Sequence, residues 1–339
     1  MGDPLFSRAT WLNSLHMSTL TVACLGERGI DAASLLEGSG ITEDDLRALQ
    51  RLINPGQEQQ VFANALRLAD TPALGLELGQ RTRISAYGLL GYALLSAPTL
   101  GEALRIGLGY PVLLGTYFHL RLVEEGDLAW LLASGYGERE ALKPFNTELC
   151  LGSLRVICAD LLGQPLPVAA LELDYPEPPD AAPLYRQAFD RAPRFGRARS
   201  GFGFPRQWLE RPLPLADPVT HREMLEQCRR QNAEFATRRA WLERVREQLA
   251  QRLASPPGLE ELARAMNCSA RSLRRHLAQQ QTSYQQLLDD LRFARAKELL
   301  QQGELPIYRI AEELGFSETA SLRHAFQRWS GQPPSQFRG

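Results

Sequence analysis

The sequence lacks the segments that direct a protein into or across a membrane. No apolar run approaches the roughly 18 residues that a membrane-spanning helix needs. The N-terminal stretch MGDPLFSRATWLNSLHM has no basic region followed by an apolar one, so we expect no signal peptide. A myristoylation motif is also absent, because Phe6 stands where that motif requires serine or threonine. The sequence therefore predicts a cytoplasmic protein with no membrane partner.

Cysteine is scarce and shows no pairing pattern. The five cysteines are an odd number, lie far apart along the chain and form no Cys-x-x-Cys. This distribution is typical of reduced, mostly buried thiols rather than of a disulfide framework. We expect no metal and no other cofactor.

The common catalytic motifs are missing as well. The chain contains no His-x-x-x-His, no Gly-x-Ser-x-Gly and no Gly-x-x-x-x-Gly-Lys. Cys150 and Cys158 lie in the apolar contexts ELCLG and VICAD, which raise rather than lower the pKa of a thiol. The sequence therefore predicts a protein that is not an enzyme.

Charge is divided unevenly along the chain, although the net charge is only −1. Residues 236–339 hold 16 Arg or Lys against 11 Asp or Glu, a net charge of +5. Of the chain's 38 basic and 39 acidic residues, 22 and 28 remain in the front part, a net charge of −6. A basic tail behind an acidic front is typical of a C-terminal domain that binds nucleic acid.

The front of the chain combines predicted helices with predicted strands. Helical spacing of apolar residues predicts helices over 11–29 and 41–53, the second with Thr42 as N-cap and Asp45 completing a near capping box. Residues 86–110 predict two short helices that separate at Pro98, where Thr99 can cap the second.

Alternating residues then predict an antiparallel sheet. The stretch YFHLRLVEEGDLAWLLAS alternates and turns at Glu-Gly-Asp, which indicates a β-hairpin. Residues 168–175 and 193–205 predict further extended segments. We therefore expect an α+β domain.

A long helix is predicted between this front domain and the tail. It runs from about Pro218 to Leu253, where a Ser-Pro-Pro-Gly stretch ends it, and Phe235, Leu242 and Leu249 repeat every seven residues within it. Since 339 residues are too many for one typical core, we expect two domains. The predicted α+β N-terminal domain covers residues 1–235, and an all-α C-terminal domain covers residues 236–339.

The tail contains one pattern twice. Residues 262–288 and 310–338 each predict a short helix, a tight turn, an N-cap serine (Ser269 and Ser317) and a second helix with apolar residues four apart. The second copy has one extra residue after its serine. Each copy is a predicted helix-turn-helix, a motif whose second helix enters the DNA major groove.

The turn and packing residues of each copy support this prediction. Gly315 in the second turn and Asn267 in the first both favour a left-handed backbone. Ala263 and Ala311, at matching positions in the first helices, allow the paired helices to cross closely.

An uninterrupted helix is predicted between the two copies, from Ser283 to about Gln302. At about 1.5 Å per residue it is about 30 Å long. Such a spacer can place two recognition helices one turn of B-DNA apart on the same face of the duplex. A single chain would then bind two successive major grooves of double-stranded DNA.

The tail resembles the AraC/XylS family of transcription regulators over about 100 residues. The family's signature is matched by Ile310, Ala311, Gly315, Phe316, Ser317, Leu322, Phe326, Gly331, Pro334, Phe337 and Arg338. One departure is Gln281, which stands where the family often has glycine. The front, less specifically, is similar to the arabinose-binding-like N-terminal domain of the subgroup that includes ornithine-utilisation regulators. The resemblance implies an activator that binds promoter DNA, contacts RNA polymerase, responds to a small molecule such as an amino acid, and forms a homodimer.

Candidate DNA contacts lie around the apolar residues of each recognition helix. On the first helix they are Arg271, Ser272, Arg274 and Arg275, and arginine forms the commonest specific contact, to guanine O6 and N7. On the second helix they are Thr319, Ala320, Ser321, Arg323 and His324. Because these offer fewer bidentate groups, we expect the second unit to depend more on phosphate contacts and DNA shape.

Candidate effector contacts cluster along the predicted hairpin. They are Tyr110, Tyr117, His119, Arg121 and Trp130. A basic effector would also need a carboxylate, for which Glu148 and Asp160 are candidates.

Two other protein classes fit parts of the sequence less well than a regulator does. The first is an enzyme or DNA-repair protein with an AraC-like helical accessory domain, whose reactive cysteine would need a Pro-Cys-His-Arg context that this chain lacks. The second is an RNA-binding or architectural protein, which would need aromatic stacking platforms rather than paired major-groove helices.

Overall fold

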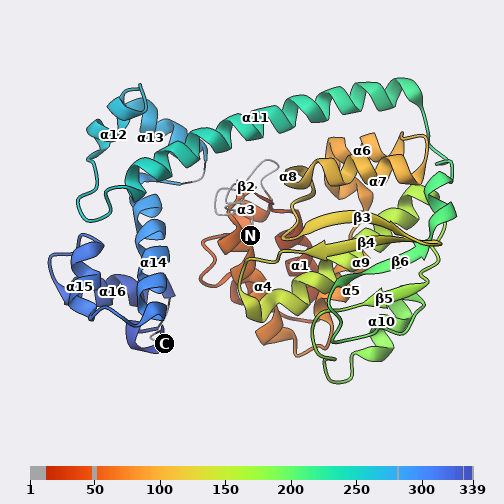
Figure 1. Cartoon of the computed structure of the whole chain (residues 1–339), viewed down its shortest axis with the longest axis horizontal. Helices are drawn as coiled ribbons and strands as arrows, with labels where there is room; N and C mark the ends of the chain where they lie inside the picture. Colours follow the sequence, from red (N-terminus) through yellow and green to blue (C-terminus); the bar gives the residue numbers. More distant parts are fainter. Residues whose placement is uncertain (1–12, 48–51, 281, 331, 338–339) are drawn as a thin grey trace. The chain divides into compact units, whose positions relative to one another are not determined.

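A computed structural model of the chain describes residues 13–47, 52–280, 282–330 and 332–337. The chain forms two compact units, Met1–Phe235 and Ala236–Gly339 (Figure 1). The first unit is α+β and the second is helical. Four residues noted in the sequence, Phe6, Gln281, Gly331 and Arg338, lie outside the described residues.

The first unit contains a four-stranded antiparallel sheet in the order β3-β4-β6-β5. Its strands are β3 (His119–Glu125), β4 (Leu128–Ser134), β5 (Ala170–Glu172) and β6 (Ser200–Pro205). The predicted hairpin is confirmed as β3 and β4, which pair from His119 opposite Ser134 to Glu125 opposite Leu128. The two further extended segments supply β5 and β6, and the predicted α+β class is confirmed.

The described part of the first unit also contains ten α-helices that lie entirely within it. They are α1 (His16–Gly26), α2 (Ala32–Leu36), α3 (Glu43–Leu46), α4 (Pro55–Ala69), α5 (Leu74–Arg81), α6 (Gly88–Leu95), α7 (Leu100–Gly109), α8 (Pro111–Leu114), α9 (Lys143–Leu162) and α10 (Ala182–Phe189). The predicted break between α6 and α7 is present, and the Thr99 side chain accepts a hydrogen bond from the backbone N–H of Glu102, as expected of an N-cap.

The helix predicted over residues 41–53 is wrong in its second half. The capping box at Thr42 and Asp45 forms, but α3 ends at Leu46. Strand β2 (Leu52–Ile53) then pairs with β1 (Asn13–Ser14). The apolar Leu52-Ile53 pair fits either structure by periodicity, and pairing with a segment far away in the sequence decides in favour of the strand.

Two glycines bring α5 and α9 into close contact. A Cβ atom on Gly79 would lie 2.8 Å from the carbonyl oxygen of Leu149, and one on Gly75 would collide with the carbonyl of Phe145. Only glycine permits backbones to approach this closely. Helix α9 also packs on the side of the sheet formed by Leu131 and its neighbours, which lie in the main core of the first unit.

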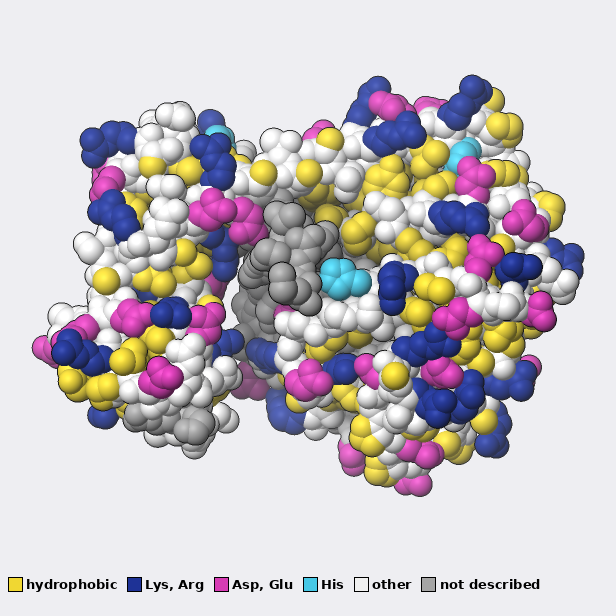
Figure 2. Space-filling view, viewed as in Figure 1, with side chains coloured by type: hydrophobic (Ala, Val, Ile, Leu, Met, Phe, Trp, Pro, Cys, Tyr) yellow, Lys and Arg dark blue, Asp and Glu magenta, His cyan; other side chains and the backbone are white. Residues whose placement is uncertain are grey.

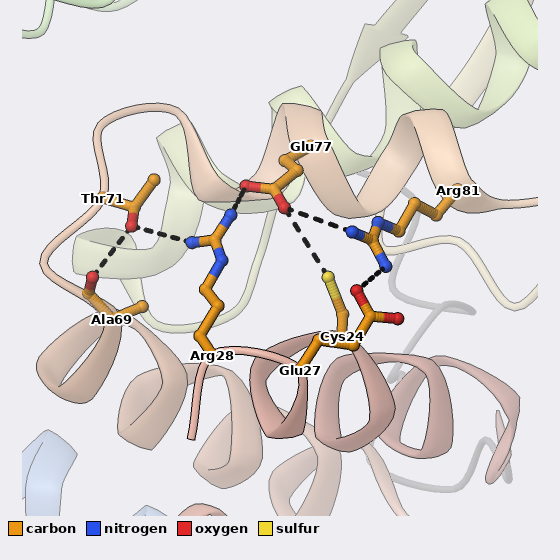
Figure 3. A network of polar contacts seen from close by, with 7 residues as sticks. All are labelled: Cys24, Glu27, Arg28, Ala69, Thr71, Glu77 and Arg81. Carbon is orange, nitrogen blue, oxygen red and sulfur yellow. Dashed lines mark hydrogen bonds and ion pairs between the residues drawn. The ribbon is translucent and has the colours of Figure 1, made fainter. Parts of the chain in front are cut away.

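A polar network joins α1 to α5 (Figure 3). Arg28 forms an ion pair with Glu77 and donates to the Thr71 hydroxyl at 3.0 Å. Arg81 forms an ion pair with Glu27 at 2.7 Å. The network lies at the rim of the core, so it orients the two helices rather than supplying much stability.

The second unit begins inside the longest helix, α11 (Pro218–Ala250). It continues with α12 (Leu259–Ala265), α13 (Ala270–Gln279), α14 (Tyr284–Gln302), α15 (Ile307–Glu313) and α16 (Thr319–Ser330). Figure 1 shows α14 joining the α12–α13 pair to the α15–α16 pair. At about 1.5 Å per residue, its 19 residues span about 28 Å, close to the predicted spacer length.

Helix α14 contributes to two separate cores in this unit. Leu287 joins Leu242, Val245 and Leu249 of α11 in the core of the first pair. Leu299 and its neighbours belong to the core of the second pair. Leu242 and Leu249 of α11, which are 5% and 0% exposed, therefore belong to the core of the second unit.

Replacing Gly315 by alanine is expected to destabilise the α15–α16 helix pair. Gly315 has φ +73°, and a Cβ atom there would lie 2.5 Å from the Ala254 carbonyl oxygen. The left-handed backbone alone costs about 1–2 kcal/mol for an alanine, and the clash adds to it. Urea unfolding should therefore show a loss of about 2 kcal/mol or more. The control is Gly258→Ala, where φ is −59° and no atom lies within 4 Å of the new Cβ; equal losses in both variants would contradict this account of Gly315.

Candidate DNA interface and ligand cavity

The first helix-turn-helix is built by the local signals that the sequence predicts. Asn267 adopts the left-handed conformation with φ +53°. Ser269 caps α13, where its hydroxyl accepts the backbone N–H of Ser272 at 3.1 Å. Leu273 and Leu277 face the core and are 0% and 1% exposed. The opposite side of α13 is therefore free to face a partner.

Three arginines occupy that exposed side of α13: Arg271, Arg274 and Arg275. None of the three forms an ion pair with any residue in the described part of the chain. Ser272 is half-buried, and its hydroxyl accepts a hydrogen bond from Ser269 at 3.0 Å, which ties it to the cap.

Other arginines of the second unit are held by acidic partners. Arg295 bonds to Glu313 at 2.6 Å, which fixes α15 to α14. Arg328 bonds to Asp289 at 3.0 Å, which fixes α16 to α14. These contacts hold the second pair in place. No described residue pairs with the guanidinium groups on α13, so they are available to bind an anion.

The second helix-turn-helix differs from its prediction at one residue. Helix α16 begins at Thr319, so the residue before it is Glu318, whose carbonyl accepts the N–H of Leu322 at 3.4 Å. Ser317 therefore lies one position too early to be the predicted N-cap. The extra residue that the second copy contains accounts for this shift.

The exposed side of α16 carries Ala320, Ser321, Arg323 and His324, while Thr319 is half-buried. Leu322 and Phe326 face the core and are 1% and 0% exposed. The Phe326 ring packs edge-on against Phe337 at a centroid distance of 5.1 Å, so the aromatic residues of the predicted signature hold the pair together.

Figure 2 shows dark blue Arg and Lys side chains over α12 and α13, with magenta Asp and Glu side chains beside them. Acidic and basic side chains are interspersed over the visible face of the first unit as well. A cluster of exposed cations on one element is typical of a DNA-binding surface, and α13 carries three arginines that no described residue pairs with.

The five candidate effector residues of the first unit do not form one group. His119 and Arg121 are exposed on the face of the sheet that also carries Trp130. Trp130 is buried beneath the Arg199 guanidinium, 4.1 Å from its ring centroid, and packs on Gly203. Tyr110 is half-buried at the end of α7 and packs against the main core.

Tyr117, another member of that set, lines a cavity of the first unit. This cavity of about 60 Å³ lies between α4, α9 and the segment that leads from α8 to β3. The Tyr117 hydroxyl donates to Oε2 of Glu58 at 2.5 Å inside it. Glu58 and Asn146, which also line this cavity, carry no sequence motif that could have identified them.

The two carboxylates considered for the effector lie elsewhere. Oδ2 of Asp160 accepts the backbone N–H of Ile84 at 3.0 Å. Glu148 is buried among Tyr185, whose hydroxyl donates to it at 2.5 Å, and the backbone N–H groups of Gly75 and Leu76. Burial raises the pKa of Glu148 to about 7.

Replacing Glu148 by glutamine is expected to remove a pH dependence of stability. Because its folded pKa is about 7 and its ordinary value is 4.5, the folded protein keeps a proton that the unfolded chain releases. This contribution is full below pH 4.5 and is lost as the pH rises to about 7. The free energy of unfolding of the wild type, relative to Glu148→Gln, should fall by roughly 2 kcal/mol between pH 5 and 8. Parallel pH profiles would contradict the prediction, and exposed Glu177→Gln serves as the control.

The cysteines and other candidate ligands show no reactive arrangement in the described residues. All five cysteines are free, and burial raises the pKa of both Cys150 and Cys158 to about 12, as their apolar contexts predict. Within the described ranges, no three His, Cys, Asp or Glu side chains are grouped as metal ligands. No helix in those ranges combines the length and apolarity needed to cross a membrane.

Comparison with known proteins agrees with these features. Residues 29–213 match the family described as the arabinose-binding domain of AraC transcription regulator, N-term, and residues 262–339 match a helix-turn-helix domain family. The ornithine utilization regulator of Pseudomonas aeruginosa is 36% identical over 314 residues, which cover 93% of this chain and 92% of that protein. The HTH-type transcriptional regulator VqsM of the same species is 29% identical over 271 residues, or 78% of this chain and 83% of that one.

Among solved structures, the transcriptional regulator CdpR from Pseudomonas aeruginosa is similar with a TM-score of 0.47 and 24% identity, over 95% of this chain and 98% of that one. The paired helix-turn-helix units define a DNA-binding transcription regulator. The chain belongs to the AraC family of such regulators.

Proposed function

We propose that this regulator binds promoter DNA with residues 236–339 and that residues 1–235 sense a small molecule and carry the dimer contact. One observation supports the DNA contact most strongly. Arg271, Arg274 and Arg275 are exposed on the side of α13 opposite its buried leucines, and no described residue pairs with them. Guanidinium groups in this position match the O6 and N7 acceptors of guanine in the major groove.

In this proposal the two recognition helices, α13 and α16, make different kinds of contact with DNA. Helix α13 supplies the base contacts, with Ser272 helping to fix its N-terminus. Helix α16 offers one guanidinium, Arg323, together with Thr319, Ala320, Ser321 and His324. These side chains suit a thymine methyl group, a single hydrogen bond or a phosphate, so the second half of the site depends more on DNA shape.

The proposal also includes gene activation in the cytoplasm in contact with RNA polymerase, and membership of the AraC family supports it. Catalysis is not part of the proposal, since the thiols of Cys150 and Cys158 are held neutral by burial. The regulator named for ornithine utilization supports an amino acid as the class of effector to test first.

The DNA site is proposed to be tandem and to be occupied by a homodimer. Because Leu242 and Leu249 are used inside the tail, the dimer contact is assigned to the first unit or to residues 219–235. Two copies then present four recognition helices, whose binding depends on the spacing of the half-sites.

Inserting half a helical turn between the half-sites is expected to weaken binding at least tenfold, because it rotates one half-site to the other face of the duplex. Fluorescence anisotropy measures the affinity, and sedimentation with and without DNA measures the mass of the complex. The control is a full-turn insertion, which restores the face. If a monomer binds one half-site as tightly as the full site, the dimer proposal fails.

A further inference from the structure

The turn of the second helix-turn-helix is held by two different elements. The first is the chain that follows α11: a Cβ atom on Gly315 would lie 2.7 Å from the carbonyl oxygen of Leu253 and 2.5 Å from that of Ala254. The second is α14, from which Nη2 of Arg292 donates to the Gly315 carbonyl at 3.3 Å. The turn that leads into the recognition helix α16 is therefore in contact with α14 and with the segment after α11.

Arg292 also reaches α16 through an aromatic ring. Its guanidinium carbon lies 4.7 Å from the ring centroid of Phe316. Phe316 packs in turn against Trp329 of α16, at a centroid distance of 6.1 Å. A planar guanidinium can stack on a ring and donate to a carbonyl at the same time, whereas the ammonium group of a lysine is a compact point charge. The two contacts of Arg292 therefore depend on the shape of its side chain as well as on its charge.

Stability alone does not account for an arginine at this position. Nε of Arg292 is buried and has no hydrogen-bond partner among the described residues. Asp289, one helical turn earlier on α14, pairs with Arg328 instead. A buried donor without a partner destabilises a fold, and a long apolar side chain would avoid that cost. The directed contacts of Arg292 to the turn explain the residue better than the stability it adds.

The segment after α11 joins the two cores of the second unit. Leu249 lies in the core of the α12–α13 pair, and Leu253 packs against the core of the α15–α16 pair. The Tyr284 hydroxyl, at the start of α14, donates to the Pro257 carbonyl at 2.8 Å and holds this segment to α14. A single connecting helix can bend and twist, so a second connection restricts how the two pairs move relative to each other.

We propose that Arg292 is a positioning residue for DNA recognition, which fixes the angle between α13 and α16 by tying α14 to Gly315 and Phe316. This inference rests on the proposed binding of both recognition helices to DNA and adds what sets the groove spacing that the chain accepts. One base pair changes the separation of two successive major grooves by about 3.4 Å and rotates one of them by about 34°. The spacing of the two grooves is therefore a sensitive measure of the angle between the helices.

A second unit that holds both recognition helices rigidly should bind tightly at one groove spacing only. Weakening the contacts of Arg292 should let the α15–α16 pair shift relative to the α12–α13 pair. The DNA must then order the two pairs itself, so binding at the native spacing weakens, while an altered spacing is tolerated better.

The test uses the full chain and a duplex selected from a random-sequence library by the wild-type protein. Fluorescence anisotropy compares this duplex with one that has a single base pair inserted between the two contacted grooves. The insertion should weaken wild-type binding by roughly tenfold or more. In Arg292→Lys, which keeps the charge, the selected duplex should bind about fivefold more weakly and the insertion should cost only about threefold.

The matched control is Arg309→Lys. Arg309 lies over the ring of Tyr308 at 5.5 Å and pairs with Glu312, but all three residues belong to α15, so these contacts join no second element. This variant should keep the wild-type loss of affinity on insertion. A shortened duplex that retains only the groove bound by α13 should bind the wild type and both lysine variants equally, because α13 is unchanged.

A second variant keeps the test decisive if Arg292→Lys does not fold. Phe316→Leu removes the ring beneath Arg292 and keeps an apolar side chain, so it should also reduce the loss of affinity on insertion. The double variant should add little to either single one, because both remove the same contact. Thermal unfolding checks that each variant is folded at the assay temperature. A loss of affinity on insertion as large as that of the wild type in both Arg292→Lys and Phe316→Leu would overturn the proposal.

The shortened duplex separates this inference from the proposed function. If the wild type binds it as tightly as the selected duplex, α16 contributes nothing to DNA binding, and both the proposed use of two grooves and this inference fail. If the wild type binds it more weakly but every variant keeps the full loss of affinity on insertion, the use of two grooves stands and only the positioning role of Arg292 fails.

Discussion

Replacing both Arg271 and Arg274 by alanine is expected to weaken binding to the regulated promoter by about 2–6 kcal/mol, at about 1–3 kcal/mol for each guanidinium that contacts a base. Both side chains are exposed, and no described residue pairs with them, so their removal leaves the fold intact. The loss should be largest for base pairs in one half of the site. Anisotropy titrations at fixed salt on the promoter and on unrelated duplex measure it.

Unrelated DNA is the internal control for this result. The loss of two positive charges weakens all DNA binding through the phosphates, but only base contacts are lost selectively on the promoter. A matched variant, Arg252→Ala with Arg309→Ala, removes the same charge from residues that pair with Glu261 and Glu312. Equal losses in the two variants would show that α13 contacts no bases.

Replacing Phe326 by alanine is expected to destabilise the second helix-turn-helix by about 3–5 kcal/mol. The side chain is 0% exposed, and its ring packs against Phe293 at a centroid distance of 5.2 Å and Phe337 at 5.1 Å. Thermal unfolding followed by circular dichroism measures the loss. The control is Tyr308→Ala, an aromatic residue of the same unit that is 52% exposed.

Hydrogen exchange would locate the effect of Phe326→Ala. Amides of α15 and α16 should lose protection, whereas α12 and α13 keep theirs because their core is separate. A uniform loss of amide protection across all helices of the second unit would contradict the division of that unit into two cores.

The tail was predictable because its signals are local. Asn267, Ser269 and Gly315 each impose a backbone conformation or a cap within a few residues, and the structure has all three as expected. The predicted cap at Ser317 failed for an equally local reason. One extra residue moves the start of α16, and a pattern of apolar positions fixes a helix end only to within a residue or two.

The sequence predicted the fold class of the first unit, but it did not predict which residues line the cavity. Strand β4, with the sequence LAWLLAS, is apolar on both faces, so alternation could not tell whether Trp130 or Leu131 faces the main core. The structure places Leu131 in that core. Glu58 and Asn146 come from α4 and α9, which are far apart in the sequence, and only tertiary packing brings them to one cavity.

Methylation interference at guanine N7, with the full chain on its promoter, tests the central claim most directly, because N7 is exposed in the major groove. The account predicts interference in two successive major grooves, about one helical turn apart on one face of the duplex. In the Arg271→Ala and Arg274→Ala double variant, interference should disappear from one of these grooves and persist in the other. Interference in a single groove, or an unchanged pattern in the variant, would contradict the claim that both helix-turn-helix units bind DNA and that α13 contacts its bases.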